Sequence, residues 1–108
     1  MKVIAVFKTH VDIGFTDSPK KILERYSSNM LLKVAEICEK TKECKNPFVW
    51  TMPAFVLHYA LRTCTEELKD RIEKLIRDDK IVWHALPLTL RTEFFSEFEL
   101  KQTLFYAK

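Results

Sequence analysis

Glycine is almost absent from this chain of 108 residues, and Gly14 is its single example. The sequence also lacks internal repeats and low-complexity stretches, which excludes repeat architectures and long disordered segments. It is rich instead in core-forming residues, because 47% are hydrophobic and 12% are aromatic. At this length, that composition predicts one folded domain at most.

Cysteine is scarce, and the three examples are unsuited to a disulfide framework. Cys38, Cys44 and Cys64 are odd in number and form no Cys-x-x-Cys motif, which also argues against a cysteine-type zinc site. We expect them to be small buried hydrophobic residues of a protein from a reduced compartment.

Long hydrophobic runs are absent as well. No stretch approaches the length of a transmembrane helix, and the apolar run at residues 3–7 is too short for the core of a signal peptide. We therefore expect a soluble cytoplasmic protein with no membrane partner, or a periplasmic one if a signal has been removed.

A one-sided basic stripe is also missing. The net charge is +3, from 18 basic and 15 acidic residues, and the basic residues alternate with acids, as in residues 66–80. Proteins that bind nucleic acid usually concentrate lysine and arginine on one face. The charge pattern therefore predicts no nucleic-acid partner.

The first half of the chain shows a strand, a long helix and a second strand. Residues 3–7 (VIAVF) are apolar without alternation, which predicts a strand buried on both faces of a parallel sheet. Ser18 and Pro19 are typical of a helix N-terminus, and helical periodicity predicts one helix from about 19 to 43. Residues 47–52 predict the second strand.

The second half continues the alternation of helices and strands. Three acid-first i,i+4 pairs predict a solvated outer face for the second of its helices; they are Glu67–Arg71, Asp70–Lys74 and Glu73–Arg77. Capping boxes are predicted at the starts of two helices. The elements are a short helix at 54–61, a helix capped by Thr63 and Glu66, a strand at 81–90 limited by Pro87, and a helix capped by Ser96 and Glu99 that runs to the chain end.

The resulting order, β-α-β-α-α-β-α, predicts an α/β fold with a parallel sheet and right-handed crossovers. Three strands are few for such a sheet, and the last helical pattern has no C-cap signal. We therefore expect residues 1–108 to be a single partial domain from the N-terminal part of a longer protein. A small self-contained three-stranded domain is the alternative.

His10 and Asp12 follow the first predicted strand and lie two residues apart. In extended backbone such residues point the same way, and an imidazole nitrogen with a carboxylate oxygen suits zinc or another first-row divalent ion. Gly14 comes directly afterwards, where a sharp turn needs a flexible backbone. Alternatively, Asp12 is an ordinary turn residue, because two ligands alone do not complete a zinc site.

The stretch THVDIGFTD, residues 9–17, resembles the start of the catalytic domain of glycoside hydrolase family 38, the α-mannosidases. His10, Asp12, Gly14 and Phe15 match the His-x-Asp, glycine and aromatic positions of that family. The resemblance implies an irregular seven-stranded β/α barrel and a retaining mechanism with two carboxyl groups. It also implies one zinc ion per full-length chain, with His10 and Asp12 as two ligands and a mannoside-like carbohydrate as substrate.

The chain departs from the usual family pattern at several positions. Lys8 stands where another histidine is frequent, Ile13 replaces a frequent proline, and Phe15 replaces a frequent tryptophan. This form of the motif resembles a divergent, mostly bacterial branch of family 38-like proteins more than it resembles the characterised mannosidases. In the family, the nucleophile and the remaining zinc ligand lie beyond residue 108, so we expect no catalytic residue here and an inactive fragment.

Three further residues are candidates for substrate binding, each with a structural alternative. Phe15 offers a stacking surface, Trp50 offers an apolar wall or is a core residue, and Glu93 binds a sugar hydroxyl or is an exposed loop acid. His84 is expected to be a core or interface histidine. We expect the fragment to self-associate through the phenylalanines near its end, which are Phe94, Phe95 and Phe98.

Two other classes of protein remain open on the sequence. One is a small noncatalytic α/β domain that acts by protein–protein contact, in which residues 9–14 only join a strand to a helix. The other is a metal-dependent deacetylase or amidohydrolase relative, although those barrels more often carry a His-x-His motif after a strand.

Overall fold

A three-stranded parallel sheet organises the computed structural model, which describes residues 1–107. The strands are β1 (Phe7–Lys8), β2 (Trp50–Pro53) and β3 (Ile81–His84), and they lie side by side in chain order. Both strand pairs are parallel, with Trp50 opposite Phe7 on one side and Ile81 on the other. The predicted α/β class and parallel sheet are therefore confirmed.

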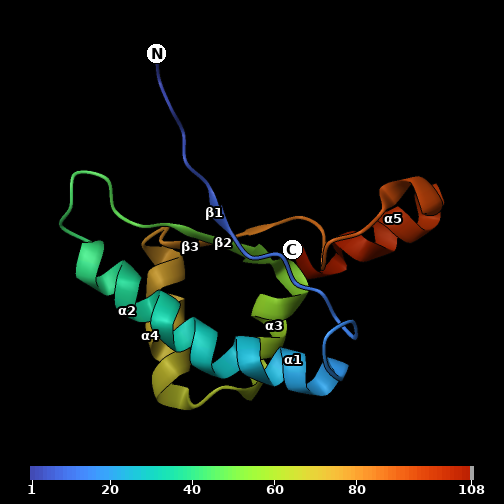
Figure 1. The fold of residues 1–108 in the computed structure, drawn as a ribbon, viewed down its shortest axis with the longest axis horizontal. Coiled ribbons are helices and arrows are strands. Elements are labelled where there is room, and N and C mark those ends of the chain that lie inside the picture. Colours follow the sequence, from blue (N-terminus) through green and yellow to red (C-terminus); the bar gives the residue numbers. More distant parts are fainter. Residues whose placement is uncertain (108) are drawn as a thin grey trace.

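Four helices cover one face of this sheet, as Figure 1 shows. They are α1 (Pro19–Arg25), α2 (Leu31–Thr41), α3 (Ala54–Thr63) and α4 (Glu66–Arg77). The core lies between the helices and the sheet, where Leu31, Met52 and Ile72 are fully buried. Within the described chain, no helix lies over the opposite face of the sheet in this view (Figure 1).

The long helix predicted over residues 19–43 forms nearly as expected, but with an irregular middle. A π-helical segment, Tyr26–Met30, joins α1 to α2 without a break. At the N-terminus, the Ser18 side chain accepts a hydrogen bond from the Lys21 backbone, and Pro19 occupies the first turn. The predicted cap at Ser18 is confirmed.

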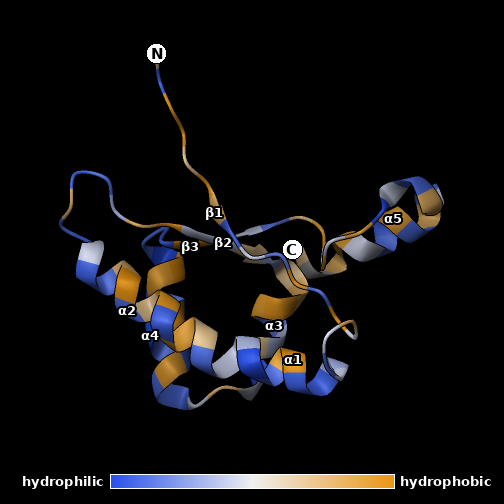
Figure 2. Ribbon diagram, in the orientation of Figure 1, coloured by the Kyte–Doolittle hydropathy of each residue, from blue (hydrophilic) through white to orange (hydrophobic). Residues whose placement is uncertain are grey.

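The prediction that residues 3–7 form a buried strand is wrong. Only Phe7 and Lys8 pair with β2, and Val3, Ile4 and Val6 are largely exposed. The reason is that β2 begins at Trp50, opposite Phe7, so the preceding residues have no neighbouring strand. They form an apolar N-terminal arm, residues 1–6, that projects from the fold (Figures 1 and 2).

Two predicted helix caps have different outcomes. Ser96 and Glu99 form a complete capping box at the start of α5 (Glu97–Thr103), as predicted. The other prediction is wrong, because α4 is capped by Thr65, whose hydroxyl accepts from the Leu68 backbone. The Thr63 hydroxyl instead donates to the Tyr59 carbonyl within α3.

The third strand is shorter than the predicted span of 81–90. After His84 the chain turns so that the carbonyls of Leu86 and Pro87 accept hydrogen bonds from the first two residues of α3. These contacts satisfy amide groups that a helix N-terminus leaves without partners. The last predicted helix also ends early, because α5 gives way to a 3-10 helix at Leu104–Ala107. The final residue lies outside the described part of the chain.

The remaining expectations concern ion pairs, cysteines and membranes. Glu73 and Arg77 pair as predicted, at 3.8 Å, but Arg71 pairs with Glu39 on α2 instead of with Glu67.

The described cysteines are free of disulfide bonds. Cys38 is buried as predicted, whereas Cys44 is exposed and its predicted burial is wrong. No helix within residues 1–107 is long and apolar enough to cross a bilayer.

Candidate metal half-site

The His10–Asp12 loop continues from the carboxyl end of β1 with alternating side chains. Thr9 and Val11 are buried, at 5% and 4% exposure, while the side chains of His10 and Asp12 are more than half exposed. The two outward groups meet, with His10 Nε2 lying 3.0 Å from Asp12 Oδ1. The convergence predicted from the two-residue spacing is thus present in the structure.

Backbone and side-chain hydrogen bonds hold this loop against its neighbours. The Thr9 amide donates to the Thr51 carbonyl of β2 at 3.3 Å. The Tyr26 hydroxyl donates to the His10 carbonyl at 3.2 Å, and the Thr9 hydroxyl lies 3.8 Å from the Met30 sulfur. Tyr26 and Met30 are the two ends of the π-helical segment, and such segments often occur at functional sites.

Gly14 turns the chain immediately after the two outward groups. Its φ is +81°, in the region that side chains other than glycine rarely adopt. A Cβ atom here would meet Pro19 Cγ at an ordinary 3.7 Å, so the dihedral angle, and not a lack of space, requires glycine. Gly14 thus has the positive φ that a sharp turn after His10 and Asp12 needs.

Asp17 completes the connection to α1. Its Oδ1 accepts a hydrogen bond from the Ser18 amide at 2.8 Å, and its carboxylate lies 3.6 Å from Lys21 and 3.5 Å from Arg25. These contacts fix the start of α1 and leave Asp17 occupied by structural partners.

The pair of groups fits half of a zinc site. Zinc ligands at 2.0–2.2 Å in tetrahedral geometry lie about 3.3 Å from each other, which is close to the observed spacing of His10 Nε2 and Asp12 Oδ1. However, residues 1–107 contain no cluster of three or more metal-binding side chains. His10 and Asp12 therefore supply two donors, and a closed site needs at least one more.

The predicted substrate-binding residues lie in different surroundings. Phe15 is 88% exposed and follows Gly14 directly, so it belongs to the same loop as the two donors. Glu93 is exposed in a short 3-10 helix, Thr92–Phe94.

Trp50 is the first residue of β2 and so lies at the amino end of the parallel sheet. The His10 loop lies at the opposite, carboxyl end. Its ring stacks on Phe48 with 5.7 Å between ring centroids and packs against the core, and its indole nitrogen is buried with no hydrogen-bond partner among residues 1–107. Trp50 and the two donors are therefore not brought together in the structure.

His84 ends β3 and is half-buried, in agreement with a core or interface role. Its Nε2 atom is buried without a partner among the described residues. Burial, followed by the nearby charge of Lys8, lowers the pKa of this imidazole. The neighbourhood of Lys8 and His84 was not predicted, because it depends on the strand register.

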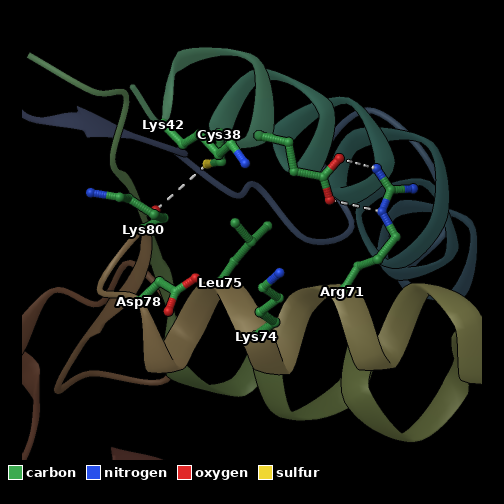
Figure 3. Close-up of a pocket in the computed structure, with 8 residues that line it drawn as sticks. Cys38, Lys42, Arg71, Lys74, Leu75, Asp78 and Lys80 are labelled. Carbon is green, nitrogen blue, oxygen red and sulfur yellow. Dashed lines mark hydrogen bonds and ion pairs between the residues drawn. The ribbon is translucent and has the colours of Figure 1, made fainter. Parts of the chain in front are cut away.

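A cavity between α2 and α4 was also not predicted from the sequence. The charge pattern predicted only a solvated outer face for α4. The cavity has a volume of about 370 Å³ and is shown in Figure 3. At one side, Arg71 Nε and Nη2 donate to the two carboxylate oxygens of Glu39 at 3.0 and 2.8 Å. These hydrogen bonds lower the pKa of Glu39 and raise that of Arg71.

Comparison of the chain with family models finds no match, and comparison with curated proteins or with solved structures finds none either.

Proposed function

We propose that this chain contributes the first β/α units of a zinc-dependent, retaining glycoside hydrolase of the α-mannosidase type. The observation that carries the proposal is the convergence of His10 Nε2 and Asp12 Oδ1 at the exposed carboxyl end of β1. In α/β proteins, the carboxyl ends of parallel strands are where binding and catalytic groups gather. The resemblance of residues 9–17 to family 38 supplies the reaction class.

The sheet is compatible with the barrel that this family implies. In a β/α barrel the helices cover the outer face of the strands, and the inner face meets the other strands across the barrel. Helices on one face only, as in Figure 1, are expected of a barrel segment, whereas doubly wound sheets carry helices on both faces. This arrangement supports the barrel proposal.

Within the proposal, each residue of the loop has a defined role. His10 and Asp12 hold the zinc ion, Gly14 turns the chain beneath them, and Phe15 offers an aromatic surface to a mannoside-like sugar. A bound zinc ion acts as a Lewis acid and template that orients sugar hydroxyls. We assign no nucleophile or general acid within residues 1–108, so the chain alone should be inactive.

Zinc titration monitored by the NMR signals of the histidine side chains tests the proposal. We expect His10 signals to shift saturably with added Zn²⁺, and the shift to disappear in Asp12→Ala. His58→Ala is the matched control, because it removes a histidine on α3 outside the loop. Equal zinc affinity in the original chain, His10→Ala and Asp12→Ala would refute the assignment of the site.

A noncatalytic α/β domain that acts by protein contact is the second candidate. The observation that favours it is the amount of exposed apolar surface, which includes the arm at residues 1–6 and Phe98 on α5. Under this alternative the contact between His10 and Asp12 is only structural. The zinc titration separates the two, because a contact domain should show no saturable shift at His10.

A further inference from the structure

The cavity between α2 and α4 lies beside the amino end of β3, whereas the His10 loop follows the carboxyl end of β1. It opens beside the carboxyl-terminal part of both helices and beside Lys80, which directly precedes β3. None of its lining residues belongs to the proposed metal half-site. A function for this cavity is therefore independent of the zinc proposal.

Positive charge predominates among the residues that line the cavity. The carboxylate of Glu39 is occupied by Arg71 through both of its oxygens, which leaves Asp78 as the second acid. Among the described residues, Lys74 and Lys80 have no carboxylate within 4.0 Å. The charged lining residues are Lys42, Arg71, Lys74 and Lys80, against Glu39 and Asp78.

Figure 3 shows how two of the cations are placed. Lys74 rises from α4 into the space between the helices, and Lys42 lies beside Cys38 on the α2 side. The single ion pair of Lys42 within the described chain is with the exposed Glu43, at a long 3.9 Å. An ammonium group from the C-cap residue of α2 and another from α4 thus line one cavity, and the charges of both also act on Glu39, whose pKa they lower.

We propose that this pocket, named here the α2–α4 pocket, binds a small oxyanion of the phosphate class through Lys42 and Lys74. Ammonium groups form charge-assisted hydrogen bonds to phosphate oxygens. A cavity of about 370 Å³ is within the size range of small-molecule sites. It has room for the organic part of a phosphate monoester as well as for inorganic phosphate.

The buried residues at the base of the pocket offer no reactive group to a bound ligand. Leu75 and Cys38 are buried there, and the Cys38 thiol donates to the Lys80 carbonyl at 3.7 Å. Burial raises the pKa of this thiol, so it stays neutral and neither attacks a ligand nor repels an anion. The pocket is therefore a binding site without covalent chemistry.

The competing explanation is that the lysines only compensate the helix ends. Both α2 and α4 end beside the cavity, and the partial negative charge at a helix C-terminus favours nearby cations. That explanation predicts that Lys74 stabilises the fold and that phosphate has no specific effect. The two explanations therefore differ in the response to ligand.

Backbone amide NMR titration with inorganic phosphate, at constant ionic strength maintained with chloride, tests the proposal. We expect saturable shifts confined to residues 38–42 and 74–80. Lys42→Gln and Lys74→Gln should each weaken the apparent affinity about tenfold, because each removes a hydrogen bond to a charged group. Lys20→Gln is the control of equal charge change on α1 and should bind as the original chain does.

A parallel titration with glycerol 3-phosphate separates the two sources of the phosphate group. Tighter binding of the monoester through the same lysines would identify a phosphorylated small molecule, and equal or weaker binding would identify free phosphate. Shifts that do not saturate, or that are the same in all variants, would overturn the proposal. So would a loss of thermal stability in Lys74→Gln with no lysine-dependent phosphate binding.

Discussion

Gly14 is the residue at which backbone geometry and the proposed chemistry meet. Its φ of +81° returns the chain toward Pro19 just after His10 and Asp12 have been presented to solvent. The buried side chains of Thr9 and Val11 anchor the residues on either side of His10 in the core. The single glycine of the chain is therefore part of the geometry on which the proposed half-site depends.

Replacing Gly14 should be costly in proportion to the strain of its conformation. We expect Gly14→Ala to lower the free energy of unfolding by about 1 kcal/mol, because a Cβ atom disfavours positive φ. Urea denaturation measures this change. Gly14→Asn is the matched control and should lose less, since asparagine tolerates the left-handed region better. Equal losses in both variants would show that the strain is not the cause.

At the scale of elements, helix starts depend on a few neighbouring residues and were mostly readable from the sequence. Ser18 and Ser96 cap their helices as predicted, because each cap needs only a hydroxyl and the next turn of backbone. The start of α4 was misplaced by two residues, because Thr63 is followed three residues later by Glu66, as in a capping box, whereas Thr65 is followed by Leu68. In the structure Thr65 is the N-cap of α4, and Thr63 is the last residue of α3.

The two threonines provide a matched test of this assignment. We expect Thr65→Ala to lower the free energy of unfolding by about 1 kcal/mol, the usual effect of losing an N-cap. Thr63→Ala should change it by less than about 0.5 kcal/mol, because an exposed hydroxyl bonded within its own helix contributes little. Thermal or urea unfolding measures both, and a larger loss at Thr63 would contradict the cap assignment.

For the whole molecule, the sequence predicted the class of fold but not that the apolar residues 3–7 are mostly exposed. The prediction of a buried strand at residues 3–7 was wrong because a buried strand needs a neighbouring strand, and β2 provides one only from Trp50 onward. The convergence of His10 and Asp12 was predictable because it depends on local spacing. The α2–α4 pocket was not, because Arg71 and Glu39 are 32 residues apart and meet only through helix packing.

The exposed apolar residues carry a consequence for the molecule in solution. The arm presents Ile4 and Val6, at 75% and 69% exposure, and α5 presents Phe98 at 70%. Exposed apolar surfaces of this kind favour association, and an unpaired apolar strand edge favours it further. We expect the mass measured by light scattering to rise above that of a monomer as the chain is concentrated.

Lysine substitutions show which surface is responsible for this association. Val6→Lys should lower the apparent mass if the arm mediates contact, and Phe98→Lys should lower it if α5 does. Ile37→Lys is the control, because Ile37 is an exposed apolar residue on α2, away from both surfaces. A constant monomeric mass at every concentration would contradict the prediction and would mean that the exposed apolar residues of the arm and of α5 do not mediate association.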